Sequence, residues 1–139
     1  MIQAATPALI LASASKARRA VLEGAGLSFE IRVAGVDEAA IKEAAQAEGI
    51  APDQAALILA DAKAERVAAS APDALVIGAD QLLVCDGAWF DKPSDMAAAR
   101  AHLQRLRGRA HELVTALVCH RGGQRIWQHV AKPCLRMRD

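Results

Sequence analysis

The chain has 139 residues, a length that fits one domain and leaves little room for a second. Apolar residues make up 53% of the sequence and aromatic residues only 3%, so the core must be built from Ala, Leu, Val and Ile. The net charge of +1, from 17 basic and 16 acidic side chains, gives no sign of a nucleic-acid or membrane partner. No apolar run reaches the length of a membrane span and residues 1–7 lack a signal-peptide pattern, so we expect a cytoplasmic protein.

The first quarter of the sequence predicts a strand, a tight turn and a helix in quick succession. Leu9–Ala12 is typical of a short buried strand, and Ser15 is placed to cap a helix over Lys16–Glu23. Residues 28–33 alternate like a second strand, and residues 36–38 then open an acidic, Ala-rich segment.

The middle of the sequence predicts a helix followed by a long strand and a hairpin. Pro52 suits a first helical turn, and apolar residues recur at helical spacing until Pro72 interrupts them. Residues 74–80 form an apolar strand that meets a carboxylate, and residues 82–85 continue it to an Asp-Gly turn. This turn predicts a hairpin with residues 88–90.

The last third of the sequence predicts one more helix and one more hairpin. Ser94 is placed to cap a helix that Gly108 ends. Residues 111–120 and 125–136 resemble two strands joined by the Arg-Gly-Gly-Gln segment 121–124. The expected fold is therefore a single α/β domain over residues 1–139, with a mixed twisted sheet flanked by helices.

Cysteine and histidine spacings argue against a preformed metal site or a redox pair. Cys85, Cys119 and Cys134 are far apart, without the close pairs of zinc or redox motifs, and we expect them to be small apolar fillers in strands. The four histidines do not fall at helical ligand spacing, which argues against a zinc cluster.

The turn after the first strand has the chemistry of an anion site. A strand that turns into a helix N-terminus directs free backbone N–H groups and the positive end of the helix dipole at one spot. Ser13 and Ser15 add hydroxyl groups, and Lys16, Arg18 and Arg19 add positive charge, so a phosphate chain suits this turn. The alternative is that Ser15 is only a helix cap and that the arginines form a solvated face.

Asp80 and Lys92 are further candidates for chemistry, although each has a simple alternative. A carboxylate after an apolar strand of an α/β fold lies where ligands bind, and there Asp80 could hold Mg²⁺ or accept a proton from water. The alternative is an Asp that only forms a turn. Lys92 precedes Pro93 in a restricted loop and could neutralise a phosphate, or it could simply be solvated.

Several short motifs occur in an order that resembles the Maf family of nucleoside triphosphate pyrophosphatases, also called septum formation inhibitor-like proteins. The resemblance extends from about Leu9 to Thr115, and several motifs in order are more specific than any one of them. The motifs are LILASAS with the following ARR, VDE, LADAKA, IGAD, DKP and LRGRAHELVTA.

This resemblance implies a fold, an activity and a set of residue roles. Maf proteins have an elongated, anvil-like α/β fold similar to that of ITPases, often form dimers, and use Mg²⁺ or Mn²⁺ to split a nucleotide into monophosphate and pyrophosphate. The implied roles are phosphate binding for Ser13, Ser15 and Arg18, metal and water management for Glu38 and Asp80, and charge neutralisation for Lys63 and Lys92. Asp80 matches the family's proton acceptor.

Two positions associated with substrate choice depart from the family pattern. The loop usually has Ser-x-Ser-Pro-Arg-Arg, but here Lys16 replaces the proline and Ala17 the first arginine. The branch that acts on dTTP and UTP carries threonine where this chain has Gln81. Gln81 instead resembles the branch that acts on 7-methyl-GTP, whereas Ala17 does not match the tryptophan of that branch. A glutamine amide offers a donor and an acceptor to a base edge, so the resemblance favours a modified purine nucleotide.

Family members continue beyond the point where this sequence stops, so we expect a domain whose C-terminal part is missing. The chain is then a truncated product, a fragment, or a shortened homologue that covers its core by self-association. Two functions remain open at this stage. The first is a metal-dependent pyrophosphatase that removes noncanonical or modified nucleotides. The second is a catalytically weak or inactive nucleotide-binding protein with a regulatory role in division or growth.

Overall fold

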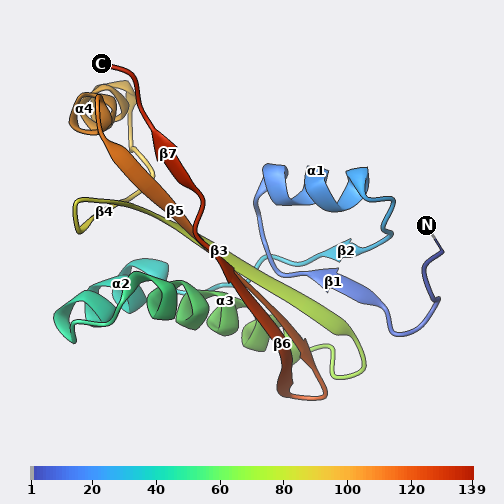
Figure 1. Cartoon of the computed structure of the whole chain (residues 1–139). Helices are drawn as coiled ribbons and strands as arrows, with labels where there is room; N and C mark the ends of the chain where they lie inside the picture. Colours follow the sequence, from blue (N-terminus) through green and yellow to red (C-terminus); the bar gives the residue numbers. More distant parts are fainter. Residues whose placement is uncertain (1) are drawn as a thin grey trace.

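Two long antiparallel strands form the centre of the fold in the computed structural model, which describes residues 2–139 (Figure 1). They are β3 (Leu75–Cys85) and β5 (Ala110–Arg121), paired so that Asp80 lies opposite Ala116. The strand order is β2-β1-β3-β5-β6, with β4 paired to β3 and β7 paired to β5. The remaining strands are β1 (Leu9–Leu11), β2 (Glu30–Ile31), β4 (Ala88–Phe90), β6 (Gln124–Ala131) and β7 (Cys134–Arg136).

The sheet is mixed, as expected from the sequence. β1 is parallel to both β2 and β3, whereas the pairs β3–β5, β3–β4, β5–β6 and β5–β7 are antiparallel. β3, which is parallel to β1 but antiparallel to β4 and β5, therefore joins a small parallel part of the sheet to a larger antiparallel part. β1 ends opposite Ile77, near the start of β3, and the chain leaves the sheet there toward the first helix.

Helices lie on both faces of this sheet, but only the face under α3 is well covered, since α1 buries none of its residues. The helix α3 (Pro52–Ala68) lies along β3 and β5 on one face, with α2 (Glu38–Ala47) beside it, and α1 (Lys16–Gly24) lies on the opposite face (Figure 1). The helix α4 (Met96–Leu106) lies at the far end with β4 and β7. No helix within residues 2–139 has both the length and the apolar character needed to cross a bilayer.

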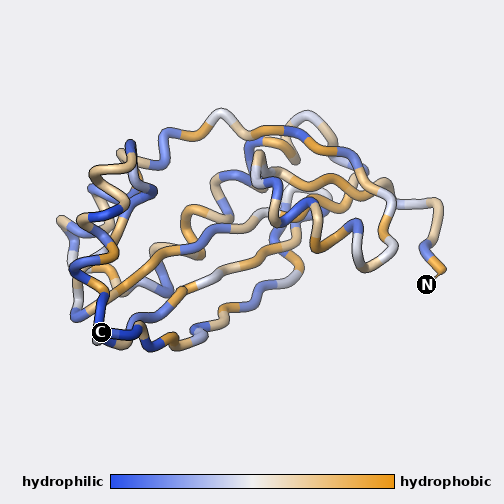
Figure 2. Tube along the Cα trace, turned by 90° about the horizontal axis from the view of Figure 1, so that it is seen from above, coloured by the Kyte–Doolittle hydropathy of each residue, from blue (hydrophilic) through white to orange (hydrophobic). Residues whose placement is uncertain are grey.

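Small side chains allow α3 to approach the sheet closely. Ala60 and Ala64 are fully buried and face Gly78 of β3. A Cβ atom at Gly78 would lie 2.3 Å from the carbonyl oxygen of Ala60, so no larger residue fits without moving the helix backbone. The core is accordingly rich in Ala, Leu, Val and Ile, as the composition predicts, and Figure 2 shows apolar stretches on the segments that pass through the interior.

Most predicted elements are confirmed, and the differences have local causes. The acidic segment after residue 36 was not predicted as a helix, but it forms α2 because the Asp37 carboxylate caps it by accepting a hydrogen bond from the Ala40 N–H. The cap predicted at Ser94 is wrong, since Asp95 caps α4 by accepting from the Ala98 N–H at 2.7 Å.

Two further predictions about the C-terminal half are corrected. The expected strand over 125–136 is split into β6 and β7, with Pro133 between them, because a proline has no N–H for a sheet ladder. All three cysteines lie in strands, but only Cys85 is buried, so the prediction that they fill the core is wrong for the exposed Cys134.

Candidate functional site

The turn between β1 and α1 is held by hydrogen bonds among its own polar groups. The Ser15 hydroxyl caps α1 by accepting from the Arg18 N–H at 3.2 Å, and the Ser13 hydroxyl accepts from the Ser15 N–H at 3.1 Å. The Arg18 guanidinium turns back and donates to the Ser13 hydroxyl at 3.3 Å. Arg19, in contrast, pairs with Glu23 on the exposed face of the helix, so the solvated alternative holds for Arg19 but not for Arg18.

This turn forms one wall of a cleft of about 280 Å³, which we call the phosphate cleft. The cleft is also lined by the start of α2, the middle of α3 and the loop after β4. It brings together six of the side chains singled out in the sequence: Ser13, Ser15, Arg18, Glu38, Lys63 and Lys92. These residues are spread over much of the sequence and meet only through the fold.

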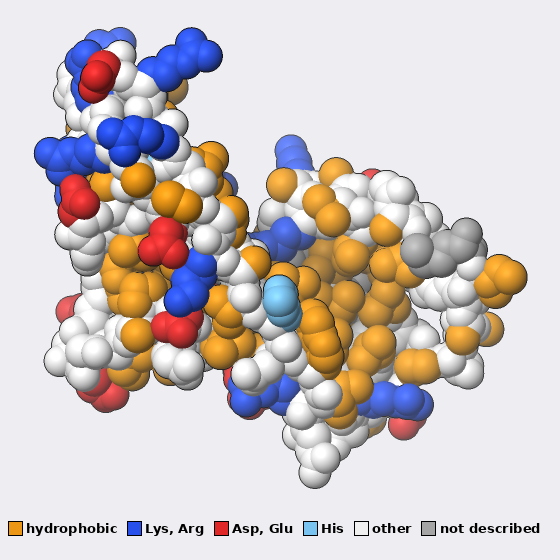
Figure 3. All heavy atoms as spheres, in the orientation of Figure 1, with side chains coloured by type: hydrophobic (Ala, Val, Ile, Leu, Met, Phe, Trp, Pro, Cys, Tyr) orange, Lys and Arg blue, Asp and Glu red, His pale blue; other side chains and the backbone are white. Residues whose placement is uncertain are grey.

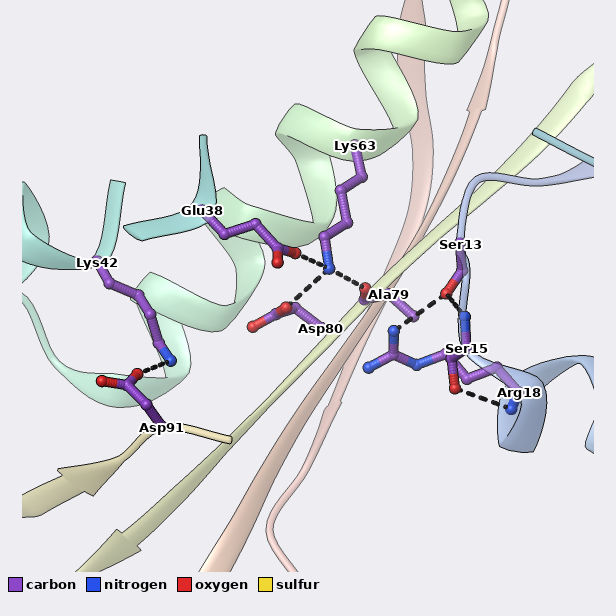
Figure 4. A network of polar contacts seen from close by, with 9 residues as sticks. All are labelled: Ser13, Ser15, Arg18, Glu38, Lys42, Lys63, Ala79, Asp80 and Asp91. Atoms are coloured by element: carbon purple, nitrogen blue, oxygen red, sulfur yellow. Dashed lines mark hydrogen bonds and ion pairs between the residues drawn. The ribbon is translucent and has the colours of Figure 1, made fainter. Parts of the chain in front are cut away.

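Lys63 joins the two acidic candidates at the centre of the site (Figure 4). Its ammonium lies 2.9 Å from Oδ1 of Asp80, forms an ion pair with Glu38 and lies 3.3 Å from the Ala79 carbonyl oxygen. The Lys63 and Asp80 side chains are each only 12% exposed. The resulting Glu38–Lys63–Asp80 triad connects α2, α3 and β3.

Asp80 lies inside a strand rather than at the end of one. The sequence predicts it at a strand terminus, but β3 continues through it to Cys85, so both this prediction and the turn-forming alternative are wrong. Its position is nevertheless at an edge of the parallel part of the sheet, because β1 pairs with β3 only as far as Ile77. The ligand-binding position expected for an α/β fold therefore still includes Asp80.

The surroundings of Asp80 oppose its ionisation. Burial raises the pKa of this carboxyl above its usual value, and the neighbouring charge of Glu38 acts in the same direction. The hydrogen bond and positive charge of Lys63 lower the pKa, but they do not overcome burial. A carboxylate in these surroundings is a better proton acceptor than an exposed aspartate.

The two positions associated with substrate choice lie outside the phosphate cleft. Ala17 and Gln81 line a second hollow of about 280 Å³ between α1 and the sheet, which we call the apolar groove. The two sites share Arg18. In the apolar groove the Gln81 amide donates to the Thr115 hydroxyl at 3.0 Å, and Thr115 donates to the Leu113 carbonyl oxygen at 3.3 Å.

Sequence reasoning missed Thr115 and Lys42. Thr115 lies directly opposite Gln81 across β3 and β5, a relation that needs the strand register. Lys42 forms an ion pair with Asp91 at 2.6 Å, immediately before Lys92 (Figure 4). Only its position four residues after Glu38 could have indicated a role for Lys42, since residues at this spacing share one face of a helix. That helix, α2, was not predicted from the sequence.

Carboxylates in this site fit a divalent cation in part. Within residues 2–139 no group of three or more His, Cys, Asp or Glu side chains is arranged to hold a metal. Glu38 and Asp80 do converge on one point, the Lys63 ammonium. Mg²⁺ needs only one or two protein carboxylates when substrate phosphates and water supply its other ligands, so these two side chains suit it.

Comparison with known sequences decides the family. The sequence pattern of the Maf-like protein family matches residues 8–139. The chain belongs to this family. It is 56% identical over 130 residues to a nucleoside triphosphate pyrophosphatase of Granulibacter bethesdensis, covering 94% of the chain and 66% of the relative. A Rhodospirillum rubrum protein of the same name is 47% identical over 99% of the chain and 68% of the relative.

Other relatives carry a more specific name. A 7-methyl-GTP pyrophosphatase of Rhizobium johnstonii is 47% identical and covers 96% of the chain and 67% of the relative. The Maf-like chain thus spans about two thirds of the length of the curated relatives it matches.

A solved structure has a related fold. It is a nucleoside-triphosphatase, or dITP/XTP pyrophosphatase, of Mycobacterium abscessus, with a TM-score of 0.50 and 18% identity over 91% of this chain and 70% of that one. The predicted α/β fold with a mixed sheet, similar to that of ITPases, is confirmed.

Proposed function

We propose that this Maf-like chain hydrolyses a nucleoside triphosphate to the monophosphate and pyrophosphate. The observation that carries the proposal is the phosphate cleft, where the cationic groups of Arg18, Lys63 and Lys92 face a shared space beside the buried Asp80. The relatives named nucleoside triphosphate pyrophosphatase support the same reaction. Phosphoryl transfer depends mainly on positioning and charge stabilisation, which these side chains can provide.

The proposed mechanism assigns a role to each of the polar groups in and beside the cleft. Asp80 accepts a proton from a water molecule as the water oxygen forms a bond to the α-phosphorus. The bond between the α-phosphorus and the bridging oxygen breaks, and pyrophosphate leaves with its negative charge facing Arg18, Lys63 and Lys92. The free N–H groups at the start of α1 and the Ser13 hydroxyl hold the phosphate chain.

We propose that the reaction also depends on Mg²⁺ or Mn²⁺. Glu38 and Asp80 are the side chains that would hold the ion. When bound, such an ion supplies charge neutralisation for the phosphate oxygens. This role requires the Lys63 ammonium to give up part of its contact with the two carboxylates and to turn toward the phosphates.

For the substrate, we propose a modified purine nucleotide, with 7-methyl-GTP as the leading candidate. The phosphates would occupy the phosphate cleft and the base would enter the apolar groove, past Arg18, where Gln81 can read its edge. The relatives named 7-methyl-GTP pyrophosphatase support this assignment. We propose further that the protein acts in the cytoplasm, as a homodimer.

The test is pyrophosphate release by the 139-residue chain, with Mg²⁺ or Mn²⁺, on 7-methyl-GTP, dTTP, UTP, dITP and the standard nucleotides. We expect selective turnover of 7-methyl-GTP by the parent chain. The Asp80→Asn variant should lower kcat by about a hundredfold or more, because amide nitrogen and oxygen cannot accept the proton of water. A folded parent chain that binds these nucleotides without releasing pyrophosphate would instead favour a regulatory nucleotide-binding role.

A further inference from the structure

We propose that Lys42 and Asp91 form a clasp that positions Lys92 in the lining of the phosphate cleft, relative to the helix that begins with Glu38. The inference rests on the proposed function, because it assigns the support of a side chain that would contact substrate phosphate. Neither residue of the clasp lines the phosphate cleft itself, so both are positioning residues.

The position of Lys92 depends on its loop. Within residues 2–139 its ammonium has no ion-pair partner, so no ion pair of its own holds it in the cleft. On the N-terminal side, the loop is anchored by Phe90, which is buried against Leu106. On the C-terminal side, regular structure resumes only with α4, after Asp95.

The clasp connects this loop to α2, which also lines the cleft. Oδ1 of Asp91 lies 2.6 Å from the Lys42 ammonium, and the Lys42 side chain is only 21% exposed although Asp91 is 80% exposed. Figure 4 shows the pair between the loop after β4 and α2, beside the Glu38–Lys63–Asp80 triad. One ion pair therefore links the residue before Lys92 to the helix that begins with Glu38.

A hollow separates the exposed side of α2 from the loop after β4, and the Lys42–Asp91 ion pair lies at this hollow. The hollow has a volume of about 270 Å³ and is lined by Ala39, Lys42, Trp89 and Asp91 among others. The apolar side chains of α2 are directed elsewhere, since Ile41 and Ala45 pack against the main core. Without the ion pair, the loop and the first turn of α2 could separate across this hollow, and the cleft would widen.

Charge reversal separates this positioning role from a simple effect of net charge. We expect Lys42→Glu and Asp91→Lys each to weaken binding of inorganic tripolyphosphate by about threefold to fivefold, because each replaces an attraction by a repulsion across the clasp. The double variant should restore the parent affinity. If only the local field mattered, Asp91→Lys would add positive charge near the cleft and strengthen binding.

The experiment is isothermal titration of tripolyphosphate into the parent chain, the two single variants and the double variant, with thermal melting to check the fold. Arg109→Glu is the matched control, because Arg109 pairs with Asp86 at 3.0 Å outside the cleft and its loss should leave affinity unchanged. Tighter binding by Asp91→Lys, or no restoration in the double variant, would overturn the clasp.

Tripolyphosphate binding tests the clasp, and pyrophosphate release tests the proposed reaction, so the two proposals can fail separately. A parent chain that fails to bind tripolyphosphate would overturn the phosphate cleft and the clasp together. A parent chain that binds tripolyphosphate but releases no pyrophosphate would overturn the proposed reaction, and the four affinities would still decide the clasp. In an active chain, the loss in the single variants should fall on KM more than on kcat.

Discussion

Burial and the Lys63 ammonium act in opposite directions on the pKa of the Asp80 carboxyl group. Burial raises its pKa and Lys63 lowers it, with burial the larger effect. If ionised Asp80 accepts the proton in the reaction, activity is lost as the pH falls through this raised pKa. The acid limb of kcat/KM should therefore lie at higher pH than the pKa of an ordinary aspartate.

Lys63→Met should move the acid limb of the kcat/KM profile further toward high pH. The substitution removes the positive charge that lowers the pKa of Asp80, so a higher pH is needed to ionise the carboxyl group. The measurement is the pH dependence of kcat/KM, and the limb position, rather than the rate itself, is compared. Lys16→Met, an exposed lysine of α1, is the control and should leave the limb in place. An unmoved limb in Lys63→Met would mean that another group limits the rate.

Thr115 determines how the Gln81 amide faces the apolar groove. Its single hydroxyl hydrogen is donated to the Leu113 carbonyl oxygen, so its lone pairs must accept from the Gln81 amide nitrogen. Thr115→Val keeps the side-chain shape but frees the amide to rotate. We expect the preference for 7-methyl-GTP over GTP, measured as a ratio of kcat/KM values, to fall by about fivefold. Thr115→Ser should keep the ratio, and an unchanged ratio in Thr115→Val would exclude Thr115 as the residue that orients Gln81.

At the scale of elements, the contact between α3 and β3 sets the geometry of the site. Lys63 lies three residues after Ala60 on α3, and Asp80 lies two residues after Gly78 on β3. The close approach of α3 to the sheet at Gly78 therefore brings the Lys63 ammonium within ion-pair distance of the Asp80 carboxylate. Gly78→Ala should push α3 away from the sheet and lower the free energy of unfolding by about 1–3 kcal/mol.

Urea denaturation measures this change, with Gly24→Ala as the matched control. A Cβ atom at Gly24, in α1, meets no other atom within 4 Å, and alanine is the better helix former. The control should therefore be as stable as the parent or slightly more stable. Equal stability of Gly78→Ala and the parent would show that α3 can shift at little cost, and turnover would then report whether the Lys63–Asp80 contact survives.

Helices and strands that are specified by neighbouring residues in the sequence could be predicted. Those that depend on packing against distant segments of the chain could not. The strand, Ser15 cap and helix around the phosphate turn follow from neighbouring residues, and the structure confirms them. The helix α2 was missed because its alanines and charged residues give a weak apolar pattern, and it is stabilised by packing against α3.

At the scale of the whole molecule, the site exists because the parallel pairing of β1 with β3 places the phosphate turn beside Asp80. Nothing in the local sequence specifies this pairing, or the register that sets Thr115 opposite Gln81. The resemblance to a family supplied the residue set, and the fold brings most of that set into one cleft. The roles of these residues remain predictions for the experiments above.

The sheet face opposite α3 leaves apolar side chains exposed, and Figure 3 shows them gathered around α1 and the neighbouring strands. Trp127 of β6 is 50% exposed and lies opposite Cys119 on this face. If the proposed homodimer covers the face, Trp127→Asp should raise the dimer dissociation constant roughly tenfold or more, since buried tryptophans are frequent hot spots.

Sedimentation velocity across a concentration series measures this constant. Met96→Asp is the matched control, because Met96 is 83% exposed but lies at the start of α4, away from the face. Dissociation of Trp127→Asp alone would place the interface on the open face of the sheet. Equal effects of the two substitutions would place the interface elsewhere, and a parent chain that stays monomeric at all concentrations would refute the homodimer, because the exposed face alone would then be insufficient for pairing.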